Sequence, residues 1–449
     1  MTDQIQLINH SSVLINNNGI KILTDPWYSG SAFNDGWSLL YENDPEEIKA
    51  ILDDLNYIFL SHEHPDHFSI KFFNDYGEII KNKKIKIIFQ HTIDKRVENF
   101  LKSKGLELLI LKDKEKYKFN DKTYFTIIKQ GHIDSSFLYE TSDAYHLNIN
   151  DCNFIEKELN EINSLIKNKK KKVILYIQFS YASFRGSDEW LKKAAKYKLQ
   201  NIVKLSKIFN SSLVVPFASL FYFSHSENQN LNKFVNNCKT VSNFLNDHKV
   251  NHCVLNPNIS LRNVNDLIEN LNFKNETNIS SIEFWDKKIK NSKIVFYEKN
   301  PIPILPENIE KFLYRLKKYN NFFLLFLIRI LSFKKIFGDV IVKINKTEEF
   351  FLVNFFKVKK IKNNNSKPDI SMSSEAFNLL LNQPYGLESL FVSGRLKTEK
   401  VDGMSKITSA LGITTINLSN YGINFKHIFN RLIFNKIIGL IYRTITQKT

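Results

Sequence analysis

The segment Ser61-His62-Glu63-His64-Pro65-Asp66-His67 directly follows an apolar stretch, Leu55–Leu60, that reads as a buried strand. Three histidines and an aspartate within six positions are costly in a core, because every ring nitrogen and carboxylate oxygen needs a partner. At the carboxyl end of a strand, the same side chains can converge on one point, and imidazole and carboxylate ligands suit Zn²⁺ or Fe²⁺. The segment therefore predicts a metal site, with His62 and His64 on one ion and Asp66 and His67 on a neighbouring ion.

The pattern around this segment predicts an α/β fold. Asn17-Asn18-Gly19 is typical of a turn between two strands, because Asn and Gly tolerate a positive φ. Strands alternate with helices, and hairpins cluster at the start and in the middle of the chain, which favours a mixed sheet. The predicted strands are 5–8, 13–15, 20–24, 55–60, 86–89, 173–179 and 213–217, the predicted helices are 45–54, 69–81, 97–104, 156–167 and 188–206, and 108–149 is hairpin-like.

The length of 449 residues predicts two to four domains. Pro301, Pro303 and Pro306 mark a change in composition, so we place a catalytic domain at 1–300 and an accessory module at 301–449. The three cysteines form no disulfide framework and no CxxC pair, which indicates a reducing compartment. The N-terminal segment lacks the pattern of a signal peptide, so we expect a cytoplasmic protein.

The net charge of +17 carries little information about partners. Only 8 of the 63 basic residues are Arg, and Arg is the side chain whose planar fork matches phosphate. A lysine-rich, solvated surface is the simpler interpretation. We therefore expect a small-molecule substrate and argue against a nucleic-acid partner, while the sequence does not indicate the oligomeric state.

The HxHxDH segment in this position resembles the metallo-β-lactamase superfamily. The resemblance implies a four-layer αβ/βα sandwich with metal ions at the sheet edge. It also implies further ligands, and His132, Asp151 and His225 occupy matching places along the chain. The complete implied metal set is His62, His64, Asp66, His67, His132, Asp151 and His225, with Asp151 bridging two ions.

Two further residues match the superfamily near its active site. Asp25 stands at the first acidic position, where a carboxylate orients a ligand histidine. His10 matches a Gly-His-Ala segment of one branch, although Asn9 replaces the glycine here. We expect His10 in the catalytic pocket and Asp66 as the base that takes the proton from the attacking water.

The branch that the chain resembles contains CMP-N-acetylneuraminate hydroxylases, ascorbate-6-phosphate lactonases and N-acyl-phosphatidylethanolamine phospholipase D. The resemblance rests on the loop Asp25–Trp37, on Asp134-Ser135, on Asn150–Cys152 and on Pro216–Ala218. We expect Trp27, Trp37, Tyr181 and Arg185 to bind the substrate. The two tryptophans would form aromatic walls of the pocket, and Tyr181 and Arg185, which follow a strand, would contact an anionic substrate.

The expected function is hydrolysis by a metal-activated water, with one or two Zn²⁺ ions, or Fe²⁺ or Mn²⁺ in their place. The substrate would be a sugar, a nucleotide sugar or a lipid-like phosphate, ester or amide. The sequence has no CxH…CxxH pattern, so it lacks the Rieske cluster of the hydroxylases. Two alternatives remain: an iron-dependent hydroxylase component that acts on a nucleotide sugar with a separate electron donor, and a nuclease of this superfamily.

The last third of the chain predicts a smaller α+β module. The segment from Asp369 to Leu396 resembles sterol-carrier-like modules. The apolar run Phe322–Phe333 is too short to span a bilayer, and it reads either as a core helix or as a helix at a membrane interface. A second amphipathic stretch, from Phe425 to Arg443, allows the same two interpretations. Contact with the inner face of a membrane is thus one expectation for this module.

Overall fold

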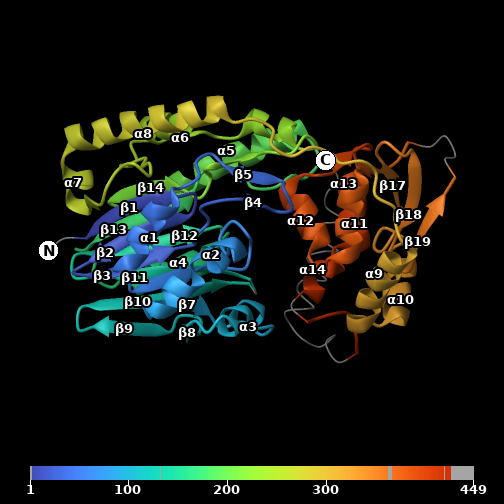
Figure 1. The fold of residues 1–449 in the computed structure, drawn as a ribbon, viewed down its shortest axis with the longest axis horizontal. Coiled ribbons are helices and arrows are strands. Elements are labelled where there is room, and N and C mark those ends of the chain that lie inside the picture. Colours follow the sequence, from blue (N-terminus) through green and yellow to red (C-terminus); the bar gives the residue numbers. More distant parts are fainter. Residues whose placement is uncertain (1–2, 132, 363–366, 419, 426–449) are drawn as a thin grey trace.

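A computed structural model describes residues 3–131, 133–362, 367–418 and 420–425 (Figure 1). The predicted strands and helices of the first 217 residues are present, and most of their ends agree within two residues. Local signals explain these ends: Asp44 and Ser69 cap the first two helices with their side chains, and Gly105 at φ 71° follows the third.

The first large sheet has seven strands in the order β16-β1-β2-β3-β6-β7-β8. Strands β1, β2 and β3 form an antiparallel meander. Strands β3, β6, β7 and β8 run parallel, so that their carboxyl ends lie at one edge of the sheet. The strands are β1 (Gln4–Asn9), β2 (Ser12–Asn17), β3 (Ile20–Thr24), β6 (Tyr57–Leu60), β7 (Lys86–Gln90), β8 (Leu108–Leu111) and β16 (Arg262–Asn263).

The second large sheet has six strands in the order β14-β13-β12-β11-β10-β9. The hairpins predicted over 108–149 supply its antiparallel half, and β12, β13 and β14 are parallel. The strands are β9 (Lys116–Asn120), β10 (Thr123–Gln130), β11 (Asp134–Glu140), β12 (Ala144–Asn150), β13 (Lys172–Gln178) and β14 (Leu213–Phe217).

The two sheets pack face to face around one apolar core, and helices cover their outer faces (Figure 1). Phe59 and Phe137, from opposite sheets, lie in this core with ring centroids 4.8 Å apart. The predicted four-layer αβ/βα sandwich is thereby confirmed. The helices over the first sheet are α1 (Pro45–Asp53), α2 (Ile70–Asn82) and α3 (Arg96–Ser103); those over the second are α4 (Glu156–Leu165), α5 (Asp188–Phe209) and α6 (Cys238–Asp247), followed by α7 (Val264–Glu269) and α8 (Leu271–Asn291).

The C-terminal part forms a second α+β body beside the sandwich (Figure 1). Its five-stranded sheet has the order β19-β18-β17-β20-β21. Its elements are α9 (Pro306–Tyr319), α10 (Phe322–Leu331), β17 (Val340–Ile344), β18 (Glu349–Val353), β19 (Val358–Ile361), β20 (Ile370–Met372), α11 (Ser374–Asn382), α12 (Gly386–Ser393), β21 (Lys397–Thr398), α13 (Gly403–Leu411) and α14 (Ile413–Asn417). The domain limits at residue 300 and the sterol-carrier resemblance stay predictions.

An apolar cluster continues from the sandwich into this C-terminal module. Trp27 and Trp37 belong to the same cluster as Phe377 and Leu390. A small sheet of β4 (Ser31–Ala32), β5 (Trp37–Leu39) and β15 (Phe221–Phe223) lies on the sandwich side of the cluster. The loops near the HxHxDH segment therefore pack directly against the C-terminal module.

Helix α10 differs from a core helix, because most of its large apolar side chains are exposed. Leu325 is buried, whereas the exposed side chains of the helix and the turn after it are Phe323, Phe326, Leu327, Ile330, Leu331 and Phe333. Among the described residues, the structure has no helix with the length and apolar composition needed to cross a membrane. The amphipathic stretch predicted from Phe425 onward lies outside the described residues, except for Phe425 itself.

Candidate metal centre

The centre lies where three strands end, and the carboxylate of Asp25 joins them. Asp25 follows β3 and adopts a φ of 35°. Its Oδ1 accepts a hydrogen bond from the backbone N–H of Ser61, after β6, at 2.7 Å. Its Oδ2 accepts one from Nδ2 of Asn150, at the end of β12, at 2.8 Å and lies 3.0 Å from Nδ1 of His67. Asp25 thus fixes the ring of His67 and connects the two sheets at this edge.

One group of ligand atoms contains His62, His64 and Asp134. Nε2 of His62 and Nδ1 of His64 lie 2.8 Å apart, and Oδ1 of Asp134 lies 4.0 Å from Nε2 of His62. The other ring nitrogen of His62, Nδ1, lies 2.8 Å from Oγ of Ser61. The two histidines thus direct one nitrogen each to a common point.

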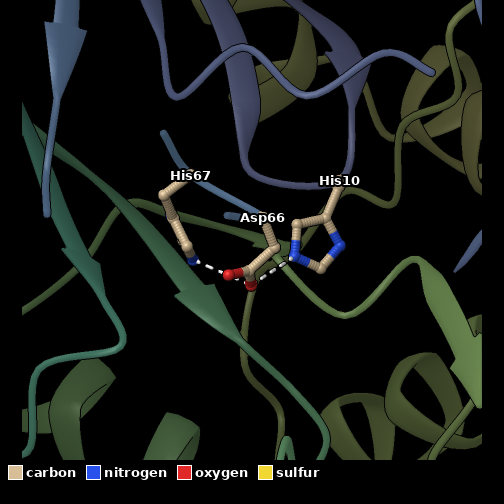
Figure 2. Close-up of side chains that lie close together, drawn as sticks. All are labelled: His10, Asp66 and His67. Atoms are coloured by element: carbon tan, nitrogen blue, oxygen red, sulfur yellow. Dashed lines mark ion pairs between the residues drawn. The ribbon is translucent and has the colours of Figure 1, made fainter. Parts of the chain in front are cut away.

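A second group contains His10, Asp66 and His67 (Figure 2). Oδ2 of Asp66 lies 3.5 Å from Nε2 of His10 and 3.3 Å from Nε2 of His67. All three residues are buried. His10 comes from the turn between β1 and β2, where its Nδ1 accepts a hydrogen bond from the N–H of Leu220 at 3.3 Å. Its Nε2 is therefore directed toward Asp66.

A third group, His62, His67 and Asp151, joins the other two. Oδ2 of Asp151 lies 3.6 Å from Nε2 of His67. Since His62 belongs to the first group and His67 to the second, Asp151 lies between the two clusters. This is the arrangement that a carboxylate bridging two ions requires.

The donor set fits divalent metal ions. Each of the three groups brings imidazole nitrogen and carboxylate oxygen atoms within 4.8 Å of one another. Nε2 of His67, the ring nitrogen that faces Asp66 and Asp151, is buried and has no hydrogen-bond partner among the described residues. Buried polar atoms without partners are costly, and coordination of Zn²⁺, Fe²⁺ or Mn²⁺ would satisfy such atoms.

The carboxyl groups of Asp66 and Asp134 have pKa values shifted in opposite directions. Burial opposes ionisation of Asp66, but the imidazoles of His67 and His10 hold its pKa well below its usual range. Burial raises the pKa of Asp134 to about 6, with Asp151 and Glu388 adding to the effect of burial. Burial would lower the pKa of His64, but the carboxylates of Glu388, Asp134 and Asp66 raise it to about 9.

Residues 4–156 match the family model of the beta-lactamase superfamily domain. This part of the chain is a beta-lactamase superfamily domain. The predicted superfamily is thereby confirmed, whereas the narrower branch stays a prediction. No curated protein matches the chain.

Solved structures similar to this chain include a possible hydrolase and a hydroxylase. One is a possible metal-dependent hydrolase from Veillonella parvula, with 13% identity over 59% of this chain and 100% of that chain at a TM-score of 0.46. Another is CmlA, a diiron beta-hydroxylase from Streptomyces venezuelae, with 12% identity over 59% of this chain and 54% of that chain at a TM-score of 0.41. The similarity therefore spans about half of the hydroxylase.

The predicted metal ligands do not all meet. His62, His64, Asp66, His67 and Asp151 come together in the superfamily domain, whereas His132 lies outside the described residues. His225 is not part of the three groups found among the described residues, and its Nδ1 lies 3.4 Å from Oε2 of Glu227. In the second group a histidine of the first hairpin, His10, is present instead.

The predicted substrate-binding residues differ in their exposure. Trp27 and Trp37 are buried beside the centre: Trp27 packs edge-on to His10, and Trp37 stacks on Phe221 with centroids 3.8 Å apart. Tyr181 is buried and its hydroxyl donates to the carbonyl of Leu231. Arg185 is exposed, and its guanidinium lies 4.7 Å from the ring centroid of Phe391, in the C-terminal module.

Two residues near the centre were not predicted as ligands or as partners of ligands. Asp134 begins β11 just after the predicted ligand His132, so an acidic residue beside that histidine was an available signal. Glu388 belongs to α12, and its Oε1 lies 3.9 Å from Nε2 of His64. No local sequence pattern connects Glu388 with the HxHxDH segment, since the packing of the two modules brings them together.

Proposed function

We propose that this protein is a metal-dependent hydrolase with a dinuclear His/Asp centre. The observation that carries the proposal is the set of three overlapping ligand groups, which share His62 and His67. His62, His64 and Asp134 would hold one ion, and the predicted ligand His132 would join them. His10, Asp66 and His67 would hold the second ion, with Asp151 between the two. His10 thus takes the place that the sequence assigned to His225.

When bound, divalent ions of this kind supply Lewis acidity and make water a nucleophile at neutral pH. The chain's own residues set the geometry of the attack. Asp25 holds the ring of His67, and Ser61 holds the ring of His62. Asp66 would hold its ion through Oδ2, and its Oδ1, which is buried and has no hydrogen-bond partner among the described residues, would accept a proton from the attacking water.

The proposed substrate is a small molecule: a sugar, a nucleotide sugar or a lipid-like phosphate, ester or amide. Arg185 supports an anionic substrate, because its exposed guanidinium stands at the junction with the C-terminal module. Trp27 and Trp37 are buried behind the ligands, so they would shape the wall of the site rather than cover a substrate.

The assignment of the second ion can be tested by metal content. The wild-type chain and the variants His10→Ala and His225→Ala are purified, loaded with Zn²⁺ and analysed for metal per chain. We expect the wild type to hold about two ions, His10→Ala about one, and His225→Ala as many as the wild type. His248→Ala removes an exposed histidine and serves as the matched control. Loss of an ion in His225→Ala alone would restore the assignment made from sequence.

The same preparation separates the alternatives. A screen of phosphodiesters, esters, lactones and sugar amides with the Zn²⁺-loaded chain should detect hydrolysis. A protein that is active only with iron, and that consumes O₂ in the presence of an external electron donor, would instead be the hydroxylase component. RNA or DNA cleavage with salt-sensitive binding would favour the nuclease.

We also propose that α10 lets this protein lie on the inner face of an anionic membrane as a cytoplasmic, peripheral protein. The exposed apolar side chains of α10 supply the inserting face. Exposed lysines at both ends of the helix, Lys317, Lys318, Lys334 and Lys335, provide charges complementary to acidic lipid headgroups.

A further inference from the structure

We propose that Glu388, a residue of the C-terminal module, orients the predicted ligand His64, so that both modules build the metal centre. The inference rests on the dinuclear centre of the proposed function. Glu388 would act through His64 and is therefore a positioning residue.

The two nitrogens of a ligand histidine ring have different partners. A metal-ligating histidine directs one nitrogen to the ion and usually donates the other N–H to an oxygen that fixes the ring. In His62 that second nitrogen, Nδ1, lies 2.8 Å from Oγ of Ser61, and in His67 it lies 3.0 Å from Oδ2 of Asp25. Both partners belong to the superfamily domain.

His64 follows the same scheme with a partner from another module. Its Nδ1 lies 2.8 Å from Nε2 of His62, which directs Nδ1 toward the first ion site. Its Nε2 is buried and has no hydrogen-bond partner among the described residues, and it faces Oε1 of Glu388 at 3.9 Å. This separation is an ion-pair distance, so Oε1 of Glu388 is the carboxylate oxygen that this ring nitrogen faces.

The position of Glu388 is fixed by its helix. The carbonyl of Phe391, in α12, accepts a hydrogen bond from the N–H of Phe184 at 2.8 Å. The carbonyl of Ser393, at the end of α12, accepts one from Nδ2 of Asn228 at 2.7 Å, and the same amide group donates to Gly36. A Cβ on Gly36 would lie 2.4 Å from Cβ of Ser393, so the two modules touch closely here.

Arg395, just after α12, makes a further contact between the C-terminal module and the first 300 residues. It is fully buried, and its guanidinium contacts Glu227 at 2.8 Å, the carbonyl of Asn34 at 2.7 Å and Glu375 at 3.0 Å. Glu227 and Asn34 belong to the first 300 residues, and Glu375 belongs to α11. These contacts do not involve the carboxylate of Glu388, which faces His64.

The inference predicts that metal affinity depends on a side chain outside the superfamily domain. Loss of such an oxygen partner typically weakens metal binding about 10- to 100-fold. Glu388→Ala should therefore raise the Kd for Zn²⁺ at the weakened site by about tenfold or more. Glu388→Gln should show a smaller loss, because the amide oxygen still accepts from Nε2–H but carries no charge.

The test measures Zn²⁺ affinity of the full chain by competition with a chromophoric chelator, so it needs no substrate. Glu310→Ala and Glu310→Gln make the same changes at an exposed position on α9 and should stay within about twofold of the wild type. Circular dichroism verifies that each variant is folded.

Two outcomes would overturn the proposal in different ways. Unchanged affinity in both Glu388 variants, with normal Zn²⁺ binding by the wild type, refutes the role of Glu388 and leaves the hydrolase proposal standing. A wild-type chain that binds none of Zn²⁺, Fe²⁺ and Mn²⁺ refutes both together.

Discussion

Replacing Arg395 by Met should separate the two modules more effectively than any other single change we consider. Arg395 is fully buried and serves two carboxylates, those of Glu227 and Glu375, whose side chains are 9% and 17% exposed. Methionine fills similar space but leaves Glu227 without its arginine partner and Glu375 with Lys299 alone, at 3.2 Å. Breaking a buried ion pair by removing one partner costs about 3–5 kcal/mol.

This loss can be measured by urea unfolding. With a slope of about 3 kcal/mol per molar urea, a cost of about 3–5 kcal/mol lowers the midpoint by about 1–2 M. Circular dichroism and tryptophan fluorescence should be followed together, because two modules need not unfold in one step. Three of the four tryptophans, Trp27, Trp37 and Trp190, lie in or against the apolar cluster that contains residues of both modules, so the fluorescence reports mainly on the junction.

Two comparisons make the result decisive. Lys397→Met removes a cation that is 77% exposed and 3.5 Å from Glu399, and it should change stability by less than about 1 kcal/mol. Adding Glu227→Gln to Arg395→Met should recover part of the loss, because one unpaired buried charge disappears. An Arg395→Met chain within about 1 kcal/mol of wild type would refute the reasoning, as would a double variant whose losses simply add.

Three other predictions concern separate parts of the molecule. Burial raises the pKa of Asp3, but hydrogen bonds from His146, Thr141 and Asn17 lower it below 3.8 overall. The stabilisation is therefore complete above pH 3.8 and disappears as the pH falls through the lowered pKa, so the gap in unfolding midpoint between wild type and Asp3→Asn should be wide at about pH 6 and should narrow progressively as the pH falls below 3.8. Tyr181→Phe should lower the free energy of unfolding in urea by about 1 kcal/mol, because the hydrogen bond to the carbonyl of Leu231 is lost, and it should leave KM unchanged. Arg185→Ala, in contrast, should raise KM. A raised KM in Tyr181→Phe would show that this tyrosine contacts the substrate. Phe326→Glu should abolish sedimentation of the protein with vesicles that contain phosphatidylserine. Tyr197→Glu, which changes another exposed aromatic residue, should not affect this sedimentation. Equal binding of both variants to the vesicles would show that α10 does not contact the lipid.

The sequence was sufficient to predict the parts of the fold that depend on local signals. The turn at Asn18 and Gly19, with φ values of 50° and 85°, and the helix cap at Ser69 are encoded by residues that are neighbours in the chain. The HxHxDH segment is equally local, because its spacing alone directs several side chains toward one point. These features needed no knowledge of the packing between elements.

The parts that could not be predicted depend on long-range packing. His10 and His225 both follow apolar strands, and nothing in their neighbours shows that His10 lies with Asp66 and His67 whereas His225 contacts Glu227. The exposure of α10 is a similar case, because an apolar run of this length has the same pattern on a surface and in a core. Glu388 is the extreme case, since only the docking of α12 brings it to His64.

The partners of the histidine rings suggest that the two ion sites differ in what supports them. Asp25 bonds to Ser61, His67 and Asn150, which follow or end strands of both large sheets, so the second site is fixed as soon as the sandwich forms. His64, at the first site, faces a carboxylate that arrives only when the C-terminal module has docked. Loosening the junction, as in Arg395→Met, should therefore weaken the ion at His64 first and leave the ion at His67 in place. Such asymmetry would make the C-terminal module a determinant of metal loading as well as a neighbour of the superfamily domain.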